Sequence, residues 1–312
     1  MRLKVSWIIS YPSLNRHSRF NPLATATTKE FNVKIRSLSS TRKITKTMKM
    51  VSASKLRKAH LAQANAKLYA QNLTGLISRI TSGVTYDSHP LLEPRETIKN
   101  VMILIITSDK GLCGAFNHNA NKQVASWIAK NRHHERIDLC CCGKRGYMFF
   151  KKHDIVKTYY KDVTADPQFS TAEKIGHDLS RLFLSKDYDE VYLTYNQFFS
   201  PLSQKTVFEK ILPIDPRVLA RETVPARTEY IFEPEIRELL AFLIPHYLYF
   251  KIYFALLENA AGEHGARMTA MDSATNSANE LIDIYTMYRN RARQAAITTE
   301  ISEIVAGADA LN

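Results

Sequence analysis

Residues 44–58 read ITKTMKMVSASKLRK, and they lie within a longer segment of one character. Residues 32–82 contain no proline, and their first glycine is Gly75. The segment is rich in Ala, Lys, Leu, Met and Gln, which are good helix formers. A helix of roughly fifty residues is about 70 Å long, whereas globular helices average about 11–12 residues. The segment therefore predicts a helix that projects from, or runs through, something else.

Apolar and small residues recur along this helix at steps of three and four, as in the seam of a coiled coil. The expected seam positions are Ile44, Met48, Val51, Lys55, Ala59, Ala62, Ala66, Tyr69, Leu73, Leu76 and Ile80. Many of them are small, which allows close approach of a second helix.

The positive charge of the chain is concentrated in the same helix. The formal net charge is +13 and the sequence pI is about 9.5. No Asp or Glu lies between Phe31 and Tyr86, although this interval holds many lysines and arginines. A solvated helix usually mixes signs to gain i,i+4 pairs. The pattern predicts a negatively charged partner, and charge that is merely solvated is the alternative.

The middle of the chain alternates strand-like and helix-like pieces. Residues 101–107 read VMILIIT, a continuous apolar run typical of a strand buried on both faces. Further strands are expected at 137–142, 155–160, 190–195 and 206–212, with helices at 119–130, 147–153 and 171–185. This alternation predicts a small α/β sheet.

Residues 235–311 are expected to be helical again, with local weakening at Gly262 and Gly265. Within them, Leu239–Leu257 comes closest to a membrane span, but Pro245, His246 and Lys251 interrupt it, so a buried helix is expected. The predicted fold class is α/β: a long antiparallel coiled coil of N- and C-terminal helices plus a small Rossmann-like α/β domain. The expected boundaries are 31–85 for the first helix, 86–232 for the α/β domain and 233–312 for the last helix.

The N-terminus differs from the rest of the chain. It carries Arg2, Lys4, Arg16 and Arg19 with several Ser and Thr, and its first acidic residue is Glu30. A basic, Ser-containing, acid-free leader is typical of a mitochondrial transit peptide, and a disordered basic tail is the alternative. We expect residues 1–30 to be the transit peptide.

The sequence contains no strong motif for catalysis or for binding a metal or a nucleotide. The four cysteines, Cys113 and Cys140–Cys142, form no CxxC pair, and we expect small core residues. The GLCG turn at residues 111–114 lacks the spacing of a phosphate loop. We expect no catalytic residue, no metal, no cofactor and no direct nucleotide binding.

Four segments resemble the gamma subunits of F-type ATP synthases. They are residues 44–58, SDKGLCGAFN at 108–117, ARMTAMDSATNSANELI at 266–282 and ARQAAITTEISEIVAGADAL at 292–311. The resemblance implies a non-catalytic rotor: the central stalk of a mitochondrial proton-translocating ATP synthase, on the matrix side of the inner membrane. The implied partners are the alpha and beta subunits of the head, the delta and epsilon stalk subunits and the membrane c-subunit ring.

The resemblance also implies contact residues. Those expected to meet beta are Arg42, Lys46, Met48, Lys49, Arg293, Gln294 and Thr298. Those expected in the apolar collar of the hexamer are Ile301, Ile304, Val305, Ala308 and Leu311. Tyr230 and Glu233 are expected to meet the ring.

Two features depart from the pattern of this family. The run HYLYFKIYF at His246–Phe254 is unusually aromatic, and we expect extra packing against the sheet domain or a stalk subunit. The regulatory cysteine insert of chloroplast members is missing.

A basic nucleic-acid-binding protein is the alternative function, but only Tyr69 among the first helix's lysines offers a stacking ring. A small α/β enzyme is the other alternative, and no catalytic constellation supports it.

Overall fold

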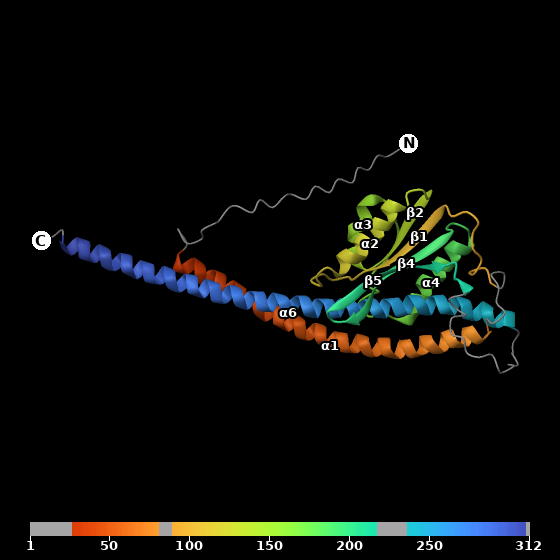
Figure 1. Cartoon of the computed structure of the whole chain (residues 1–312), viewed down its shortest axis with the longest axis horizontal. Coiled ribbons are helices and arrows are strands. Elements are labelled where there is room, and N and C mark those ends of the chain that lie inside the picture. The colour runs from red at the N-terminus through yellow and green to blue at the C-terminus, as the bar shows by residue number, and fades with distance from the viewer. Residues whose placement is uncertain (1–26, 81–88, 217–235, 310–312) are drawn as a thin grey trace. The chain divides into compact units, whose positions relative to one another are not determined.

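The computed structural model describes residues 27–80, 89–216 and 236–309 (Figure 1). The chain divides into two compact units. We call Lys43–Asn276 the sheet unit, and Met1–Arg42 with Ser277–Asn312 the terminal unit. Two helices, α1 (Thr28–Ile80) and α6 (Ile236–Asp309), contribute to both units.

The sheet unit contains one five-stranded sheet in the order β3-β2-β1-β4-β5. The strands are β1 (Asn100–Ile106), β2 (Arg136–Cys142), β3 (Val156–Tyr160), β4 (Glu190–Ser200) and β5 (Ser203–Leu212). The first four are parallel, and β5 runs antiparallel to β4. The predicted α/β fold class is confirmed. Strand β4 continues beyond its predicted end at residue 195 because the hairpin partner β5 pairs with it up to Ser200.

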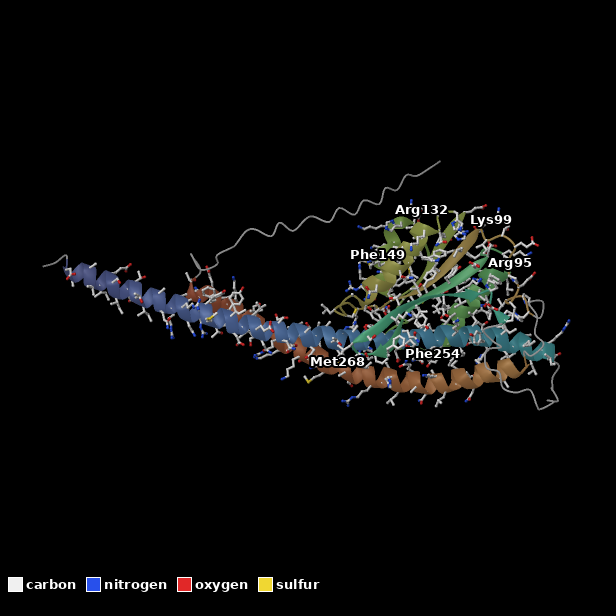
Figure 2. The ribbon with its side chains drawn as sticks, viewed as in Figure 1. Arg95, Lys99, Arg132, Phe149, Phe254 and Met268 are labelled. Atoms are coloured by element: carbon white, nitrogen blue, oxygen red, sulfur yellow. The ribbon has the colours of Figure 1, made fainter. Side chains whose placement is uncertain are left out.

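Helices cover both faces of the sheet (Figure 1). They are α2 (Phe116–Lys130), α3 (Lys144–Phe150) with the short η2 (Lys151–His153), and α4 (Phe169–Leu184). Alternate residues of β1 enter two cores, as the period of a strand requires. Ile103 packs towards α2, whereas Leu104 packs towards α4, α1 and α6. Phe254 of α6 packs against this second core (Figure 2).

The cysteines of β2 divide between the same two cores. Cys140 and Cys142 belong to the core that contains α6, and Cys141 belongs to the other. All four cysteines of the chain are buried free thiols. Burial raises the pKa of the Cys140 and Cys141 thiols to about 12. The prediction of small core residues is confirmed.

Helix α1 begins with a capping box that the sequence analysis missed. The Thr27 N–H donates to Glu30 Oε2 at 3.3 Å, and the Glu30 N–H donates to Thr27 Oγ1 at 3.4 Å. One turn later the buried ring of Phe31 lies 6.3 Å from the ring of Tyr285 and 6.2 Å from that of Tyr288, between centroids. Residues 28–30 are therefore helical, although they fall within the expected leader.

The predicted seam of α1 is wrong in its first half. Ile44, Val51 and Lys55 are exposed, whereas Thr45, Ser52 and Leu56 are buried. The most apolar stripe of this part faces outwards, because α6 approaches along a stripe of small and polar residues instead. Further along, the predicted seam positions Ala66 and Leu73 are buried.

Helix α6 is continuous through Gly262 and Gly265, so these two glycines do not break it. A Cβ on Gly262 would lie 2.9 Å from the Phe116 ring, and one on Gly265 would lie 3.1 Å from the Phe198 ring. The glycines thus let the helix lie close to α2 and β4.

By length and hydropathy, α6 also contains one window that qualifies as a membrane span. Within the first part of the helix, Ile244, Leu248 and Ile252 are fully or almost fully buried in the core of the sheet unit, whereas Phe242 is exposed. This burial fits the expected core helix.

The aromatic run of α6 packs within the sheet unit. The Tyr249 ring lies against Gly176 of α4 so closely that no room remains for a Cβ there. The Phe250 ring lies 4.8 Å from the Tyr69 ring of α1, between centroids. Packing against the sheet domain, the first of the two expected roles, is confirmed.

We expect Phe250→Ser to lower the free energy of unfolding by about 3 kcal/mol or more, because Phe250 is only 7% exposed in a packed core. Phe242→Ser is the matched control, because Phe242 is 68% exposed on the same helix and its loss should change stability by less than about 0.5 kcal/mol. Thermal unfolding of the purified protein measures both. Equal midpoints for the two variants would contradict the packing argument.

Candidate partner-binding surfaces

The first candidate surface is the basic side of α1, whose only acidic residue is Glu30. Three predicted contact residues, Arg42, Lys46 and Lys49, follow one another along it at steps of four and three, and the fourth, Met48, lies between the last two in sequence. Lys46 is exposed and forms no ion pair within the described residues, and Met48 is half-buried. Lys46 therefore offers an accessible positive charge, whereas Met48, two residues further on, points to a different side of the helix.

The two outer members of this set also bond to α6. In the sheet unit, Lys49 Nζ lies 2.6 Å from Asp272 Oδ1. In the terminal unit, Arg42 Nη1 donates to Asn279 Oδ1 at 3.3 Å. Both side chains thus bond to the neighbouring helix α6, and no local sequence pattern could reveal these bonds.

The second candidate surface lies towards the end of α6. Arg293, Gln294 and Thr298 are all exposed. Thr298 Oγ1 donates to the Gln294 carbonyl at 3.0 Å, one turn back along the helix. The Arg293 guanidinium and the Gln294 amide face solvent and can hydrogen-bond to a partner.

The last described turns of α6 are apolar and exposed. Ile301, Ile304 and Val305 are 56, 66 and 54% exposed, and Ala308 is exposed as well. Their steps of three and four residues place them on one side of the helix. Contiguous exposed apolar side chains of this kind mark an interaction site. Leu311, Tyr230 and Glu233 lie outside the described residues.

A third feature, not predicted from the sequence, is a basic cavity of about 370 Å³ in the sheet unit. It lies between α1, α6 and the loop after β1, and Lys55, Lys110 and Arg145 are among its lining residues. None of these three forms an ion pair within the described residues. The cavity therefore adds positive charge beside the basic side of α1.

A buried ion pair borders this cavity. Arg267 Nη2 lies 2.5 Å from Glu263 Oε1, and Arg267 Nε donates to the Gly111 carbonyl at 3.1 Å. Burial raises the pKa of Glu263, and burial together with the Arg267 charge lowers the pKa of His264 to about 4. The pair joins α6 to the loop after β1. The i,i+4 spacing of Glu263 and Arg267 is the sequence signal that could have found it.

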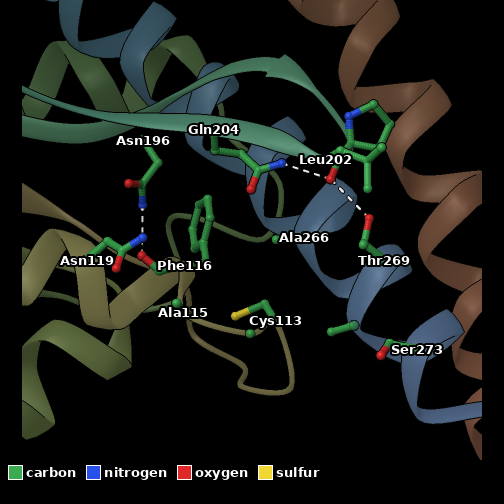
Figure 3. A pocket seen from close by; sticks show the side chains of 13 residues that line it. Cys113, Ala115, Phe116, Asn119, Asn196, Leu202, Gln204, Ala266, Thr269 and Ser273 are labelled. Carbon is green, nitrogen blue, oxygen red and sulfur yellow. Dashed lines mark hydrogen bonds between the residues drawn. The ribbon is translucent and has the colours of Figure 1, made fainter. Parts of the chain in front are cut away.

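A smaller cavity of about 250 Å³ lies where the β4–β5 hairpin meets α6 (Figure 3). Cys113 and Phe116 line it from the loop after β1 and the start of α2. Thr269 Oγ1 and Gln204 Nε2 both donate to the Pro201 carbonyl, at 3.0 and 2.9 Å. These bonds hold the hairpin end against α6.

Part of the carboxyl edge of the parallel strands, where α/β enzymes bind their ligands, is occupied by a carboxylate of the protein itself. Asp109 Oδ1 accepts from the Lys144 N–H at 2.9 Å, and Asp109 Oδ2 accepts from Thr164 Oγ1 at 2.8 Å. A carboxylate thus occupies the start of α3, so the enzyme alternative gains no support from this edge.

Comparison with known proteins agrees with this picture. The family model described as ATP synthase matches residues 27–311. The ATP synthase gamma chain of Trichlorobacter lovleyi is 39% identical over 289 residues, which are 92% of this chain and 99% of the relative. That of Geotalea uraniireducens is 41% identical over 288 residues, with the same shares covered.

Solved structures show the same fold. The central stalk and c-ring of Tetrahymena thermophila mitochondrial ATP synthase contains a chain that is 28% identical with a TM-score of 0.56, covering 74% of this chain and 99% of that one. A chain of the Euglena gracilis mitochondrial ATP synthase is 17% identical with a TM-score of 0.64, covering 91% of this chain and 94% of that one.

The fold and the exposed helix surfaces define a class: non-catalytic stalk proteins built from two terminal helices and a small α/β domain. The chain belongs to the F-type ATP synthase gamma subunit family, whose members form the central stalk. Catalysis in that complex resides in the beta subunits, and nothing found here supports the nucleic-acid-binding alternative.

Proposed function

We propose that this chain is the rotating central shaft of a mitochondrial proton-translocating ATP synthase. It transmits torque from the membrane ring to the catalytic alpha/beta hexamer during ATP synthesis. The observation that carries the proposal is the exposed apolar side of α6 at Ile301, Ile304 and Val305. Side chains of this kind are normally buried, so a surrounding apolar surface is expected to cover them.

In this proposal, each surface has its own partner. Lys46, Met48, Arg42 and Lys49 meet acidic loops of beta, because lysines attract carboxylates over about 8 Å without fixed geometry at physiological salt. Arg293, Gln294 and Thr298 make polar contacts with a second part of beta. The residues that meet the collar of the hexamer are Ile301, Ile304, Val305, Ala308 and Leu311.

The remaining partners belong to the α/β domain. The delta and epsilon stalk subunits are proposed to bind there, and Tyr230 and Glu233 are proposed to meet the membrane c-subunit ring. Two solved relatives that resemble this chain are described as parts of assemblies that include a c-ring, which supports this assignment. The proposed domain limits are those expected from the sequence, 31–85, 86–232 and 233–312, except that the first helix already begins at Thr28.

The mitochondrial location is proposed from the basic leader. The bacterial relatives are covered over 99% of their length by about 92% of this chain, and the family match starts at residue 27. The acid-free leader lies before that point and is proposed to be removed after import. The mature protein is then peripheral, on the matrix side of the inner membrane.

Import of the full-length precursor into isolated mitochondria tests this location. We expect a shortened product that depends on the membrane potential and copurifies with alpha and beta. Its N-terminus should lie at or before Thr27, because Thr27 and Glu30 cap α1 through each other's backbone N–H groups. A precursor without residues 1–26 is the control and should stay outside. Cleavage after Phe31, or no import, would contradict the proposal.

A further inference from the structure

We propose that a row of polar contacts, rather than an apolar seam, fixes the register of α1 against α6 in the sheet unit. In this proposal the main role of Lys49 is its contact with α6 of the same chain. The contacts of the row are Thr45–Thr275, Lys49–Asp272 and Gln63–Glu258. The proposal goes beyond the proposed function, because the row sets the register whether or not Lys49 also meets beta.

The contacts recur in step along both helices. Lys49 Nζ lies 2.6 Å from Asp272 Oδ1, and Gln63 Nε2 donates to Glu258 Oε1 at 2.6 Å. Gln63 follows Lys49 by two heptads, while Glu258 precedes Asp272 by two heptads. The two contacts therefore repeat on the same sides of two antiparallel helices. The hydroxyl oxygens of Thr45 and Thr275, 2.7 Å apart, extend the row by one turn.

The side chains between these contacts discriminate poorly between registers. Ser52 is buried, Ala59 and Ala62 are half-buried, and all three are small. Small side chains form shallow knobs that would also fit neighbouring positions of a facing helix. Leu56 is the one large apolar residue of α1 buried between Lys49 and Gln63. Under these conditions polar contacts at the seam specify the register.

A slip of one heptad would break the row in either direction. One slip would place Gly265 opposite Lys49 and Lys251 opposite Gln63. The other would place Gly265 opposite Gln63. Both would separate Asp272 from Lys49, and neither supplies a new carboxylate for that lysine. Lys49 and Glu258 lose their partners in both slips, and such mismatches act against the alternative registers.

The two charged contacts contribute in different ways. The side chains of Lys49 and Asp272 are 42 and 47% exposed, so solvent screens the attraction between them. The pair therefore adds little to the stability of the protein and acts mainly by favouring one register over the others. Glu258 is buried, and its Oε2 also accepts from the Phe198 N–H of β4 at 2.6 Å. The Gln63–Glu258 contact is thus anchored to the sheet, whereas the Lys49–Asp272 contact is screened by solvent.

A disulfide reporter tests the register in the full-length chain expressed with its head subunits. Thr45→Cys and Thr275→Cys place two thiols where the hydroxyls now touch, and the contacts at Lys49 and Gln63 remain. Asp272→Lys opposes two lysines, and we expect it to slow disulfide formation roughly two- to five-fold. Adding Lys49→Asp reverses the pair, and we expect the parent rate to return.

Lys46→Asp is the matched control, because Lys46 is exposed, lies one turn from Lys49 and is outside the row. Its disulfide rate should equal the parent rate. If Lys46→Asp uncouples the complex at an unchanged rate, that result concerns the beta contact alone and keeps the two proposals distinguishable. If Asp272→Lys does not accumulate, Asp272→Asn replaces it, with a smaller slowing expected. A parent rate in Asp272→Lys, or failure of the reversed pair to restore it, would overturn the register proposal.

Discussion

A disulfide between residue 298 of this chain and a facing cysteine in beta should stop ATP hydrolysis completely, and reduction should restore it. Thr298 is exposed on α6, and its hydroxyl bonds only to its own helix among the described residues, so Thr298→Cys should not disturb the fold. If the shaft must turn past three beta subunits, one covalent bond to any of them blocks every site at once.

The measurement is the hydrolysis rate before oxidation, after oxidation and after addition of a reductant. Thr298→Cys without the cysteine in beta is the control, and it should keep its rate under oxidation. The cross-linked fraction is read from a non-reducing gel. Full turnover in a fully cross-linked sample would exclude rotation of α6 against beta.

Glu263→Ala should destabilise the sheet unit more than any surface change. The side chains of Arg267 and Glu263 are only 8 and 6% exposed, and the variant leaves the guanidinium buried without its carboxylate. Breaking a buried pair by removing one partner costs about 3–5 kcal/mol. We expect a fall of roughly 6–20 °C in the unfolding midpoint of a unit of this size.

Two further variants separate this cost from a general effect of losing an ion pair. Glu135→Ala removes the ion pair between Glu135 and Lys99, whose side chains are 65 and 58% exposed, and should leave the unfolding midpoint almost unchanged because solvent screens this pair. Glu263→Leu with Arg267→Met replaces the buried pair by apolar groups and should recover much of the loss. Differential scanning calorimetry of the purified complex gives all three midpoints. A small shift of the unfolding midpoint in Glu263→Ala would mean that water reaches the Arg267 guanidinium.

The sheet was predictable because its signals are local. The run at residues 101–107 has the apolar continuity that a central parallel strand requires, and β1 is buried from Val101 to Ile106. The capping box at Thr27 and Glu30 was equally readable, since the Thr-x-x-Glu spacing is itself the signal. It escaped notice because these residues were assigned to the leader.

The seam of α1 was not predictable in the same way. The prediction placed the most apolar stripe of α1 against the partner helix, whereas Ile44 and Val51 of that stripe are exposed. The choice of face depends on which residues of α6 lie opposite. Asp272 is far from Lys49 in the sequence, so no local pattern could pair them. The same holds for the bond between Arg267 and the carbonyl of Gly111.

The candidate contact residues were predicted by resemblance, and the structure adds their exposure and neighbours. Lys46, Arg293 and Ile304 are accessible, as a contact residue must be. Lys49 is already bonded within the chain. Periodicity alone does not separate accessible contact residues from residues that are already bonded within the chain, because both lie on a polar part of a helix.

The buried native thiols have a practical consequence for optical experiments. Maleimide dyes react with thiolates, and burial raises the pKa of Cys113, Cys140, Cys141 and Cys142, so that few thiolates form at neutral pH. One cysteine added at an exposed position should therefore take up a fluorophore or a gold bead alone. Angular motion could then be recorded from a chain that keeps all of its own sulfur atoms.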